Sequence, residues 1–428
     1  MAGGALWLYR VALRAALPLA APALWLRDRA AGKARPPLAE RLGRGVPPVR
    51  PGGLWIQAVS VGEVEVARRL VRELDGRAAD LPLLVTATTA TGLALARRTL
   101  APRAAVHPCP LDLVRPVRRV FEAAAPGALV LVETELWPEM LHQAARRGVP
   151  VAVVNARLSE RSFGRYRMAG PLLGSLLAPV GLVAAREAAD AERFAALGVP
   201  EARIVVTGNV KYDLEPDPSP LEWEARFRAW AGDRFVLAVG STMEGEEAMV
   251  LDAVAAAGGA ERFMLLVAPR HPERFDAVAA LLEARGIATV RRTAPEAAPE
   301  RPGAFLLDTI GELSRAYRLA DGAFIGGSLV PTGGHNPLEP AVWGVPVLTG
   351  PHLFNFAEVY ATMIASGGVA VAAGAEELAR RLREWAGDRE VPRRIGAIAR
   401  ATVEANRGAA GRTAEAVLRL AGIASGGV

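Results

Sequence analysis

From Leu54 onward, short apolar runs alternate with helix-like stretches, and this alternation limits the possible folds more than any other feature of the sequence. A first series of predicted strands covers residues 54–59, 81–87, 128–133, 149–154, 181–185 and 203–208. A second series covers residues 235–240, 263–269, 286–290, 304–308, 322–327 and 345–350. Strands that alternate with helices in this way predict parallel sheets wrapped by helices, which is an α/β fold.

The two series of strands are separated by residues 213–220, DLEPDPSP, where three prolines in eight residues interrupt the pattern. A chain of 428 residues exceeds the size at which a single core keeps growing, so two domains are expected. We predict one domain over residues 46–212, a linker over 213–222, and a second domain over 223–428 that includes the C-terminal helices. The two parallel sheets would face a central cleft, with ligands outside the carboxyl ends of the strands.

The charge balance favours anionic partners. Lys and Arg number 51 against 45 Asp and Glu, which gives a net charge of +6. Phosphates or lipid headgroups fit this excess, and we expect no nucleic acid partner. The single cysteine, Cys109, excludes an intrachain disulfide, and the five scattered histidines have no metal-ligand spacing. A reducing, cytosol-facing location is therefore expected.

The N-terminal segment, residues 1–45, is apolar at first and basic afterwards. Its uninterrupted apolar run, residues 15–26, has twelve residues, fewer than the ~20 that span a bilayer. Aromatic residues near its ends and the basic flank that follows predict a membrane anchor or an interfacial helix on the cytoplasmic side. The alternative is a helix that packs on the protein's own surface.

The ends of the strands in the second domain are rich in groups that suit a phosphate. Residues 326–340, GGSLVPTGGHNPLEP, combine a flexible loop with Asn336 at a predicted N-cap, Pro337 at the first helical position and Glu339 at the third. A helix N-terminus of this kind suits an anion, although an ordinary capped helix would give the same pattern. Residues 240–247, 268–275 and 308–313 end three more strands similarly, so we predict a nucleotide site.

The first domain carries candidates for acid–base chemistry at its strand ends. Glu63 lies at a predicted helix start after the first strand and could accept a proton, or could only complement the helix dipole. Glu133 ends a buried strand, where a carboxylate is costly unless it is paired or faces a cleft. Lys211 precedes the linker and could meet a leaving phosphate, or could be a solvated lysine. Four arginines form a candidate anchor for an anionic acceptor, or a basic solvated face: Arg157, Arg161, Arg165 and Arg167.

Two motifs are absent from the sequence. It contains no Asp-x-Asp pair and no Gly-x-Gly-x-x-Gly after a strand, which argues against a carboxylate-bound metal and against an ordinary dinucleotide site. A base in one domain and phosphate-binding loops in the other fit a metal-independent glycosyl transfer.

Eight motifs in order, AVSVGE, ETELWPE, NARLSERS, GNVKYD, GSTMEGEE, PRHPERF, DTIGEL and GGSLVPTGGHNPLEP, resemble the 3-deoxy-D-manno-octulosonic acid (Kdo) transferases of Gram-negative bacteria. The resemblance covers about residues 50–360. It implies a GT-B fold of two Rossmann-like domains, with acceptor binding in the first and CMP-sugar binding in the second. It also implies an inner-membrane enzyme that moves Kdo from CMP-Kdo to the lipid A precursor (lipid IVA) with inversion, in lipopolysaccharide core biosynthesis.

The resemblance also assigns roles residue by residue. Glu63 matches the proton acceptor of the family, and Glu133 and Lys211 match residues proposed to stabilise the transition state. The positions that match CMP-contacting segments are Pro269, Arg270, Ile310, Gly311, Glu312, Asn336, Pro337, Leu338 and Glu339.

The expected partners are CMP-Kdo as the donor, a bisphosphorylated lipid A precursor as the acceptor, and inner-membrane lipids, with no cofactor. Two alternatives remain open at this point. One is another GT-B enzyme, either a transferase for a different nucleotide sugar or an epimerase. The other is a non-catalytic, membrane-bound nucleotide-binding module.

Overall fold

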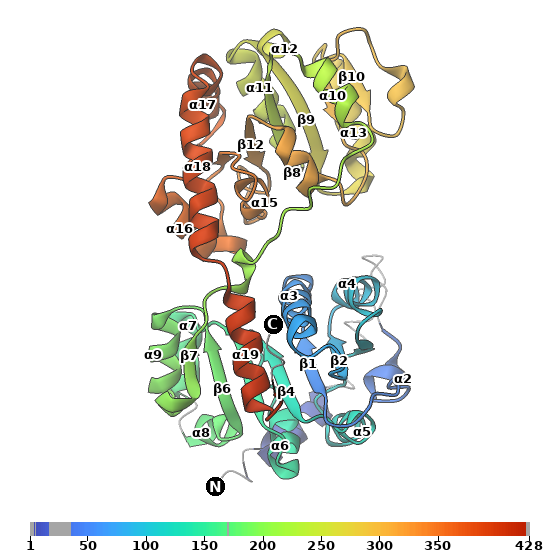
Figure 1. Cartoon of the computed structure of the whole chain (residues 1–428), viewed down its shortest axis with the longest axis vertical. Coiled ribbons are helices and arrows are strands. Elements are labelled where there is room, and N and C mark those ends of the chain that lie inside the picture. Colours follow the sequence, from blue (N-terminus) through green and yellow to red (C-terminus); the bar gives the residue numbers. More distant parts are fainter. Residues whose placement is uncertain (1–3, 5, 17–35, 169–170, 425–428) are drawn as a thin grey trace. The chain divides into compact units, whose positions relative to one another are not determined.

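The computed structural model describes residues 4, 6–16, 36–168 and 171–424. The chain divides into two compact units, one formed by Met1–Asp213 together with Arg407–Val428 and the other by Leu214–Asn406 (Figure 1). Each unit is an α/β domain with its own sheet, as the alternating sequence pattern predicts.

The first unit contains a parallel sheet whose strand order is β3-β2-β1-β4-β5-β6-β7. Its strands are β1 (Leu54–Ala58), β2 (Leu83–Ala87), β3 (Ala105–Pro108), β4 (Ala128–Val132), β5 (Val151–Ala156), β6 (Val180–Ala185) and β7 (Ile204–Val206). The chain runs from β1 outward to β3 and then returns to the other side of β1 at β4. The point between β1 and β4 is therefore the topological switch point of this sheet, where open α/β sheets bind their ligands.

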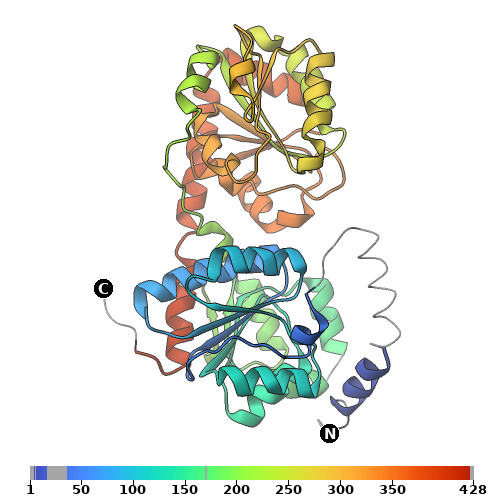
Figure 2. The same ribbon diagram turned by 90° about the vertical axis from the view of Figure 1, so that its right-hand side faces the viewer.

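Helices cover both faces of the first sheet (Figure 2). The described helices of this unit, besides residues 6–16, are α2 (Leu38–Arg41), α3 (Val61–Arg77), α4 (Ala90–Leu100), α5 (Val114–Ala124), α6 (Pro138–Arg147), α7 (Glu160–Met168), α8 (Pro171–Leu177), α9 (Ala188–Ala196) and α19 (Ala409–Leu420). The apolar sides of α3, α4 and α19 share one core with the sheet, and those of α5, α6, α8 and α9 share the other. Because both faces are covered, the central strands are apolar at almost every position.

The second unit repeats this design with the strand order β10-β11-β9-β8-β12-β13-β14. Its strands are β8 (Phe235–Thr242), β9 (Phe263–Pro269), β10 (Thr289–Arg291), β11 (Ala304–Leu306), β12 (Gly322–Ile325), β13 (Val347–Thr349) and β14 (Val369–Val371). The switch point of this sheet lies between β8 and β12, which pair in parallel.

The second sheet is also covered on both faces. Its helices are α10 (Glu224–Ala231), α11 (Glu246–Ala256), α12 (Gly259–Arg262), α13 (Phe275–Ala284), α14 (Leu313–Ala316), α15 (Leu338–Ala341), α16 (Ala357–Ser366), α17 (Ala375–Gly387) and α18 (Glu390–Ala405). One core joins the sheet to α11, α13 and α17, and another joins it to α10 through a cluster of aromatic rings that includes Trp223, Phe227 and Phe305.

Two strands were not predicted from the sequence, β3 and β14. Each lies at an edge of its sheet and pairs with one neighbour only, β2 or β13. Their apolar runs are short, and β3 ends at Pro108, which is the kind of sequence that an edge strand tolerates. The twelve predicted strands each have a counterpart in the structure.

The domain boundaries differ from the prediction at the C-terminus. The first crossing of the chain between the units, after Asp213, falls at the start of the predicted linker. The prediction that residues 223–428 form one domain is wrong for residues 407–428, which return to the first unit. The physical reason is the small-residue face of α19, where Ala410, Ala414 and Val417 are buried in the core formed with α3 and β6.

The N-terminal prediction falls partly on residues 1–3, 5 and 17–35, which lie outside the described residues. Residues 6–16 are helical. Tyr9 donates a hydrogen bond to Asp112 at 2.7 Å, and Arg10 forms an ion pair with the buried Glu139 at 2.7 Å. Trp7, Leu8 and Val11 are exposed. In the part of the chain that the structure describes, no helix is long and apolar enough to cross a membrane.

Candidate active site

The two carboxylates singled out in the first domain flank the switch point of its sheet. Glu63 lies in the first turn of α3, which follows β1, and Glu133 is the first residue after β4. Strands β1 and β4 are neighbours in the parallel sheet, so both side chains belong to the same carboxyl edge. The structure therefore brings together two residues that are seventy positions apart in the sequence.

Glu63 is almost buried, with 7% of its surface exposed. Its Oε2 accepts a hydrogen bond from the Val59 N–H at 2.5 Å, and its Oε1 accepts a longer one from the Ser60 hydroxyl at 3.2 Å. Burial raises the pKa of Glu63 to about 7; the Val59 hydrogen bond opposes this, and the negative charges of Glu133 and Glu135 add to it. A carboxylate with this pKa can accept a proton near neutral pH.

Glu133 is held between two cations. Arg186 donates a hydrogen bond from Nη2 to Glu133 Oε1, and the Lys211 ammonium lies 3.9 Å from the same oxygen. The backbone of Glu133 has a φ of 60°, which is unusual for a residue other than glycine and is typical of functional sites. The three side chains Glu133, Arg186 and Lys211 together carry a net charge of +1.

Arg186 was not predicted as a site residue. It is the first residue after β6, in the same relation to its strand as Glu133 to β4, and its side chain is buried. Its position directly after a predicted strand was the signal that could have identified it. Asn155 in β5 was also missed, although it begins the NARLSERS motif; its backbone carbonyl accepts a hydrogen bond from Arg186 Nε at 3.1 Å.

Glu135 lies two residues after Glu133, in the segment between β4 and α6. In the structure it is half-buried, and burial together with the charge of Glu133 raises its pKa. It therefore belongs to the carboxylate group around Glu63 rather than to the solvated surface.

The four arginines predicted to anchor an acceptor are all exposed. Arg157 precedes α7, and the other three lie on it. Arg161 and Arg165 are one turn apart and share a side of the helix. Arg167 lies over the ring of Phe163, with its guanidinium carbon 5.9 Å from the ring centre.

At the switch point of the second sheet, the carboxylate of Glu246 fills the place where a phosphate was expected. Its oxygens accept hydrogen bonds from the backbone N–H groups of Gly327, Ser328 and Leu329, at 2.6, 2.8 and 2.8 Å, and from Met243 N at 2.8 Å. These four amides are therefore not available to a phosphate, and the nucleotide site predicted at these strand ends stays a prediction. The protein's own buried anion occupies the amides.

The helix that follows Asn336 begins one residue later than predicted. Helix α15 begins at Leu338 rather than at Pro337 and has four residues, so its dipole is small. The Asn336 side chain still caps it by accepting a hydrogen bond from Leu338 N at 3.1 Å, and it donates to Glu339 Oε1 at 3.3 Å. A helix of four residues therefore gives little reason to expect a phosphate at its N-terminus.

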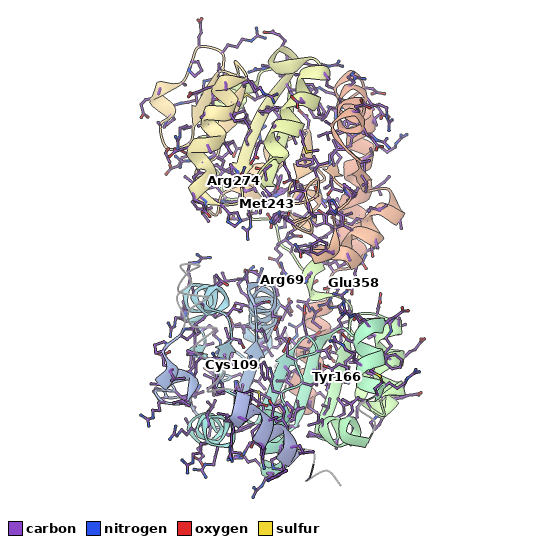
Figure 3. All side chains as sticks on the ribbon, turned by 180° about the vertical axis from the view of Figure 1, so that it is seen from behind. Arg69, Cys109, Tyr166, Met243, Arg274 and Glu358 are labelled. Atoms are coloured by element: carbon purple, nitrogen blue, oxygen red, sulfur yellow. The ribbon has the colours of Figure 1, made fainter. Side chains whose placement is uncertain are left out.

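Arg270 follows Pro269 at the end of β9 and has an exposed side chain. Burial lowers the pKa of His335, and the positive charges of Arg270 and His271 act in the same direction, which places these three residues near one another. Arg274, in the 3₁₀ turn Pro272–Arg274 after the same strand, donates to the carbonyl of Thr242 at the end of β8 at 3.0 Å and pairs with Glu247 at 2.7 Å. Figure 3 shows Arg274 beside Met243. The positive charge at the carboxyl edge of the second sheet therefore comes from arginine side chains rather than from a helix dipole.

The third predicted nucleotide segment combines an exposed residue with a fixed carboxylate. Ile310 has 65% of its surface exposed, and Gly311 has a φ of 97° that favours glycine. Glu312 accepts a hydrogen bond from Trp223 Nε1 at 3.0 Å and forms an ion pair with Arg292 at 3.3 Å. Burial by itself would raise the pKa of Glu312. The interactions with Trp223 and Arg292 and a hydrogen bond from the Thr309 hydroxyl nevertheless hold this pKa below its usual value.

Among the residues that the structure describes, no group of three or more His, Cys, Asp or Glu side chains is arranged to hold a metal ion.

Two Rossmann-like domains, each with a ligand edge at its switch point, define the fold class of GT-B glycosyltransferases and related epimerases. The fold is similar to that of the UDP-GlcNAc 2-epimerase of Neisseria meningitidis, with a TM-score of 0.57 over 86% of this chain and 100% of that chain. At 13% sequence identity, this likeness concerns the fold alone.

Sequence comparison identifies the family. Residues 37–214 match the family model described as 3-deoxy-D-manno-octulosonic-acid transferase (kdotransferase). The chain is 37% identical to the 3-deoxy-D-manno-octulosonic acid transferase of Haemophilus influenzae, over 87% of this chain and 88% of that protein. It is also 37% identical to the protein of that name from Bordetella pertussis, over 96% and 98% of the two chains. The chain belongs to the Kdo transferase family, and the resemblance found in the sequence motifs is confirmed.

Proposed function

We propose that this protein transfers Kdo from CMP-Kdo to a hydroxyl group of the lipid A precursor, with inversion at the anomeric carbon. Glu63 carries the proposal, because it joins a position at the switch point to a pKa of about 7. A base with that pKa is half-deprotonated near neutral pH and can still take up a proton as the acceptor oxygen attacks. Membership of the Kdo transferase family supports the choice of donor.

In the proposed step, the acceptor hydroxyl gives its proton to Glu63 while its oxygen forms a bond to the anomeric carbon of Kdo. Oε1 is the better placed oxygen, since its bond from Ser60 is longer than the bond from Val59 to Oε2. The bond between the anomeric carbon and the phosphate oxygen breaks, and CMP leaves with the electron pair. Lys211 and its partner Glu133 stabilise the charge that develops in the transition state.

We further propose that the second domain binds the cytidine nucleotide at the exposed edge formed by Arg270, Ile310 and Gly311, with Pro269 and Glu312 shaping it. One side of this nucleotide site would be formed by Asn336, Pro337, Leu338 and Glu339. This side would be rigid, because the side chains of Asn336 and Glu339 are hydrogen-bonded to each other. Arginine side chains can bind one phosphate without a metal ion or another cofactor.

The acceptor is proposed to bind through exposed arginines of the first domain. Arg161 and Arg165 present two guanidinium groups on one side of α7, which suits the phosphates of a bisphosphorylated glycolipid. Replacing both with Gln is expected to raise the acceptor KM and to leave the KM for CMP-Kdo unchanged. Arg118→Gln, on α5, is the matched control for loss of an exposed arginine.

An inner-membrane location, on the cytoplasmic side, is proposed as well. The exposed Trp7, Leu8 and Val11 form an apolar surface on a helix whose other side is tied to the domain through Tyr9 and Arg10. Replacing Trp7 and Leu8 with Ser is expected to reduce binding to vesicles that contain anionic lipid.

Mass spectrometry of a bisphosphorylated lipid A precursor, incubated with the protein and with CMP-Kdo generated in situ, tests the activity. A gain of one or more Kdo masses is expected. Glu63→Gln should lower the rate by about 10²- to 10⁴-fold, the usual contribution of a general base. Glu65→Gln, two residues further along α3, removes a carboxylate that pairs with Arg68 and should leave the rate unchanged. Transfer by Glu63→Gln at the wild-type rate would exclude Glu63 as the base.

A further inference from the structure

The first domain contains a buried arginine, Arg186, that touches three parts of the candidate active site. Its backbone N–H donates to the carbonyl of Ala156 at 3.1 Å, which fixes the end of β6 against β5. Its Nε donates to the carbonyl of Asn155, and its Nη2 donates to the carboxylate of Glu133. The guanidinium therefore bridges the ends of three adjacent strands, β4, β5 and β6.

Asn155 is the second half of this arrangement. It lies within β5 with a φ of 50°, at a place where the register between β5 and β6 shifts. Its side-chain Oδ1 accepts a hydrogen bond from Val210 N at 3.1 Å, at the start of the 3₁₀ turn Val210–Tyr212 that carries Lys211. One residue thus holds the backbone of the Lys211 turn with its side chain and holds Arg186 with its carbonyl.

We propose that Arg186 is a positioning residue of the transfer reaction, which fixes and neutralises Glu133 so that Lys211 presents its charge to the anionic substrate. This inference rests on the proposed function, because that function assigns Glu133 and Lys211 to the transition state. Without Arg186, the group formed by Glu133, Arg186 and Lys211 would lose one of its two positive charges, and its net charge would fall from +1 to zero.

The geometry explains why an arginine occupies this position. The planar fork of the guanidinium can donate to the Asn155 carbonyl and to the Glu133 carboxylate at the same time, whereas a lysine ammonium reaches as a single point. Glu133 has a left-handed backbone conformation, which persists only where surrounding contacts hold the residue, and Arg186 supplies one such contact.

The charge of Arg186 also reaches Glu63 through Glu133. The groups that act on Glu63 are the charges of Glu133 and Glu135 and the hydrogen bonds from Val59 and Ser60. Arg186 and Lys211 in turn face Glu133. Removing Arg186 leaves the negative charge of Glu133 less compensated, so Glu63 should hold its proton to higher pH.

The experiment compares Arg186→Gln and Arg186→Lys with wild type and with a control, Arg193→Gln. Arg193 also packs in the first domain, where it donates to the carbonyl of Leu158 at 3.0 Å and lies 3.7 Å from Asp190 and 3.8 Å from Glu160. Arg186→Gln is expected to lower kcat by about 10²-fold, as a misplaced catalytic group does, with little change in the donor KM. Arg186→Lys should restore part of kcat, and Arg193→Gln should keep the wild-type value.

The pH dependence separates positioning from a purely structural role. The acidic limb of the kcat profile should move to higher pH in Arg186→Gln and to lower pH in Glu133→Gln. A loss of kcat that follows a loss of folded protein, with the acidic limb unmoved, would overturn the proposal. So would a wild-type kcat and profile in Arg186→Gln.

A second measurement does not depend on the activity. The ¹³C NMR titration of the Glu63 carboxyl group, assigned with Glu63→Gln, should show a higher pKa in Arg186→Gln than in wild type. If wild type transfers no Kdo, the proposed function fails, while the shift in this titration still supports the coupling of Arg186 to Glu63. If wild type is active and the titration is unmoved, only the role of Arg186 is overturned.

Discussion

Glu246 and Gly327, 81 positions apart, are joined by a 2.6 Å hydrogen bond between a carboxylate oxygen and a backbone N–H at the switch point of the second sheet. The carboxylate has no exposed surface and accepts three further backbone hydrogen bonds. The glycine-rich loop therefore owes its conformation to an anion that the protein carries itself. The loop fixed in this way supports the residues that follow it in the sequence, up to helix α15.

Replacing Glu246 with Gln is expected to destabilise the second domain. The amide NH₂ would face an N–H donor, which leaves buried donors without acceptors at a cost of about 1–3 kcal/mol for each one. Urea unfolding measures this loss, and a parallel loss of CMP binding is expected because the loop 327–335 would move. Glu244→Gln, two residues earlier and exposed, is the control and should behave as wild type. Unchanged stability in Glu246→Gln would contradict the assigned hydrogen bonds.

The pKa of Glu63 predicts the pH dependence of activity. Because the base acts in its deprotonated form and its pKa is raised to about 7, kcat/KM should rise with pH and level off above that value. The pH profile of wild type, measured with the donor supplied in excess, should show this limb. Glu63→Gln should have a flat profile over the same range. A wild-type limb near pH 4.5 would mean that Glu63 is not buried as the structure has it.

The same shift predicts a pH dependence of stability with a definite sign. The folded-state pKa of Glu63 lies above its ordinary value of 4.5, so its contribution to stability is fully present below pH 4.5 and is lost as pH rises through about 7. Glu63→Gln removes the buried charge, and its Tm relative to wild type should therefore be higher at pH 8 than at pH 5. Glu65→Gln should show no such difference, and a reversed sign for Glu63→Gln would contradict the shift.

The central strands of both sheets could be predicted because parallel strands buried on both faces are continuous apolar runs. The edge strands β3 and β14 could not, because a few apolar residues with one hydrogen-bonded neighbour give a weak signal. The sequence also did not allow us to predict that α19 returns to the first unit. The pattern of Ala410, Ala414 and Val417 marks a buried helix face without naming the sheet that covers it.

The candidate site was predictable where a residue's place after a strand was enough, as for Glu63 and Glu133. The site was not predictable where the role of a carboxylate depends on the groups that donate hydrogen bonds to it. Glu246 has the same kind of position as Glu63, but its oxygens meet four backbone N–H groups, whereas those of Glu63 meet one N–H and one hydroxyl. Three of the four N–H groups that Glu246 meets, those of Gly327, Ser328 and Leu329, come from the loop after β12, distant in sequence.

The contacts of the N-terminal helix predict unequal effects of two substitutions. Tyr9→Phe removes one hydrogen bond to Asp112, while Arg10→Gln leaves the fully buried carboxylate of Glu139 without its cation. Leaving a buried charge unpaired costs more than losing one hydrogen bond, so Arg10→Gln should release the helix more. Hydrogen exchange of residues 6–16 measures the release, with the exposed Arg14→Gln as control. Equal exchange in all three variants would contradict these contacts.

Asp213 supplies the cap that α19 lacks in its own sequence. Its two carboxylate oxygens accept hydrogen bonds from the N–H groups of Gly408 and Ala410, at the start of that helix. The cap therefore ties together the two points at which the chain crosses between the units. Asp213→Asn retains one acceptor and turns an NH₂ donor toward the other N–H, so a loss of about 1–2 kcal/mol in the stability of the first unit is expected.

Hydrogen exchange of residues 409–420 should locate this loss at α19, since the core contacts of Ala414 and Val417 remain. Glu415→Gln is the matched control, because Glu415 lies on the exposed side of the same helix, where it pairs with Arg419. Faster exchange in both variants would show that any loss of negative charge loosens α19. Faster exchange in Asp213→Asn alone would show that the cap stabilises α19 in addition to its core contacts.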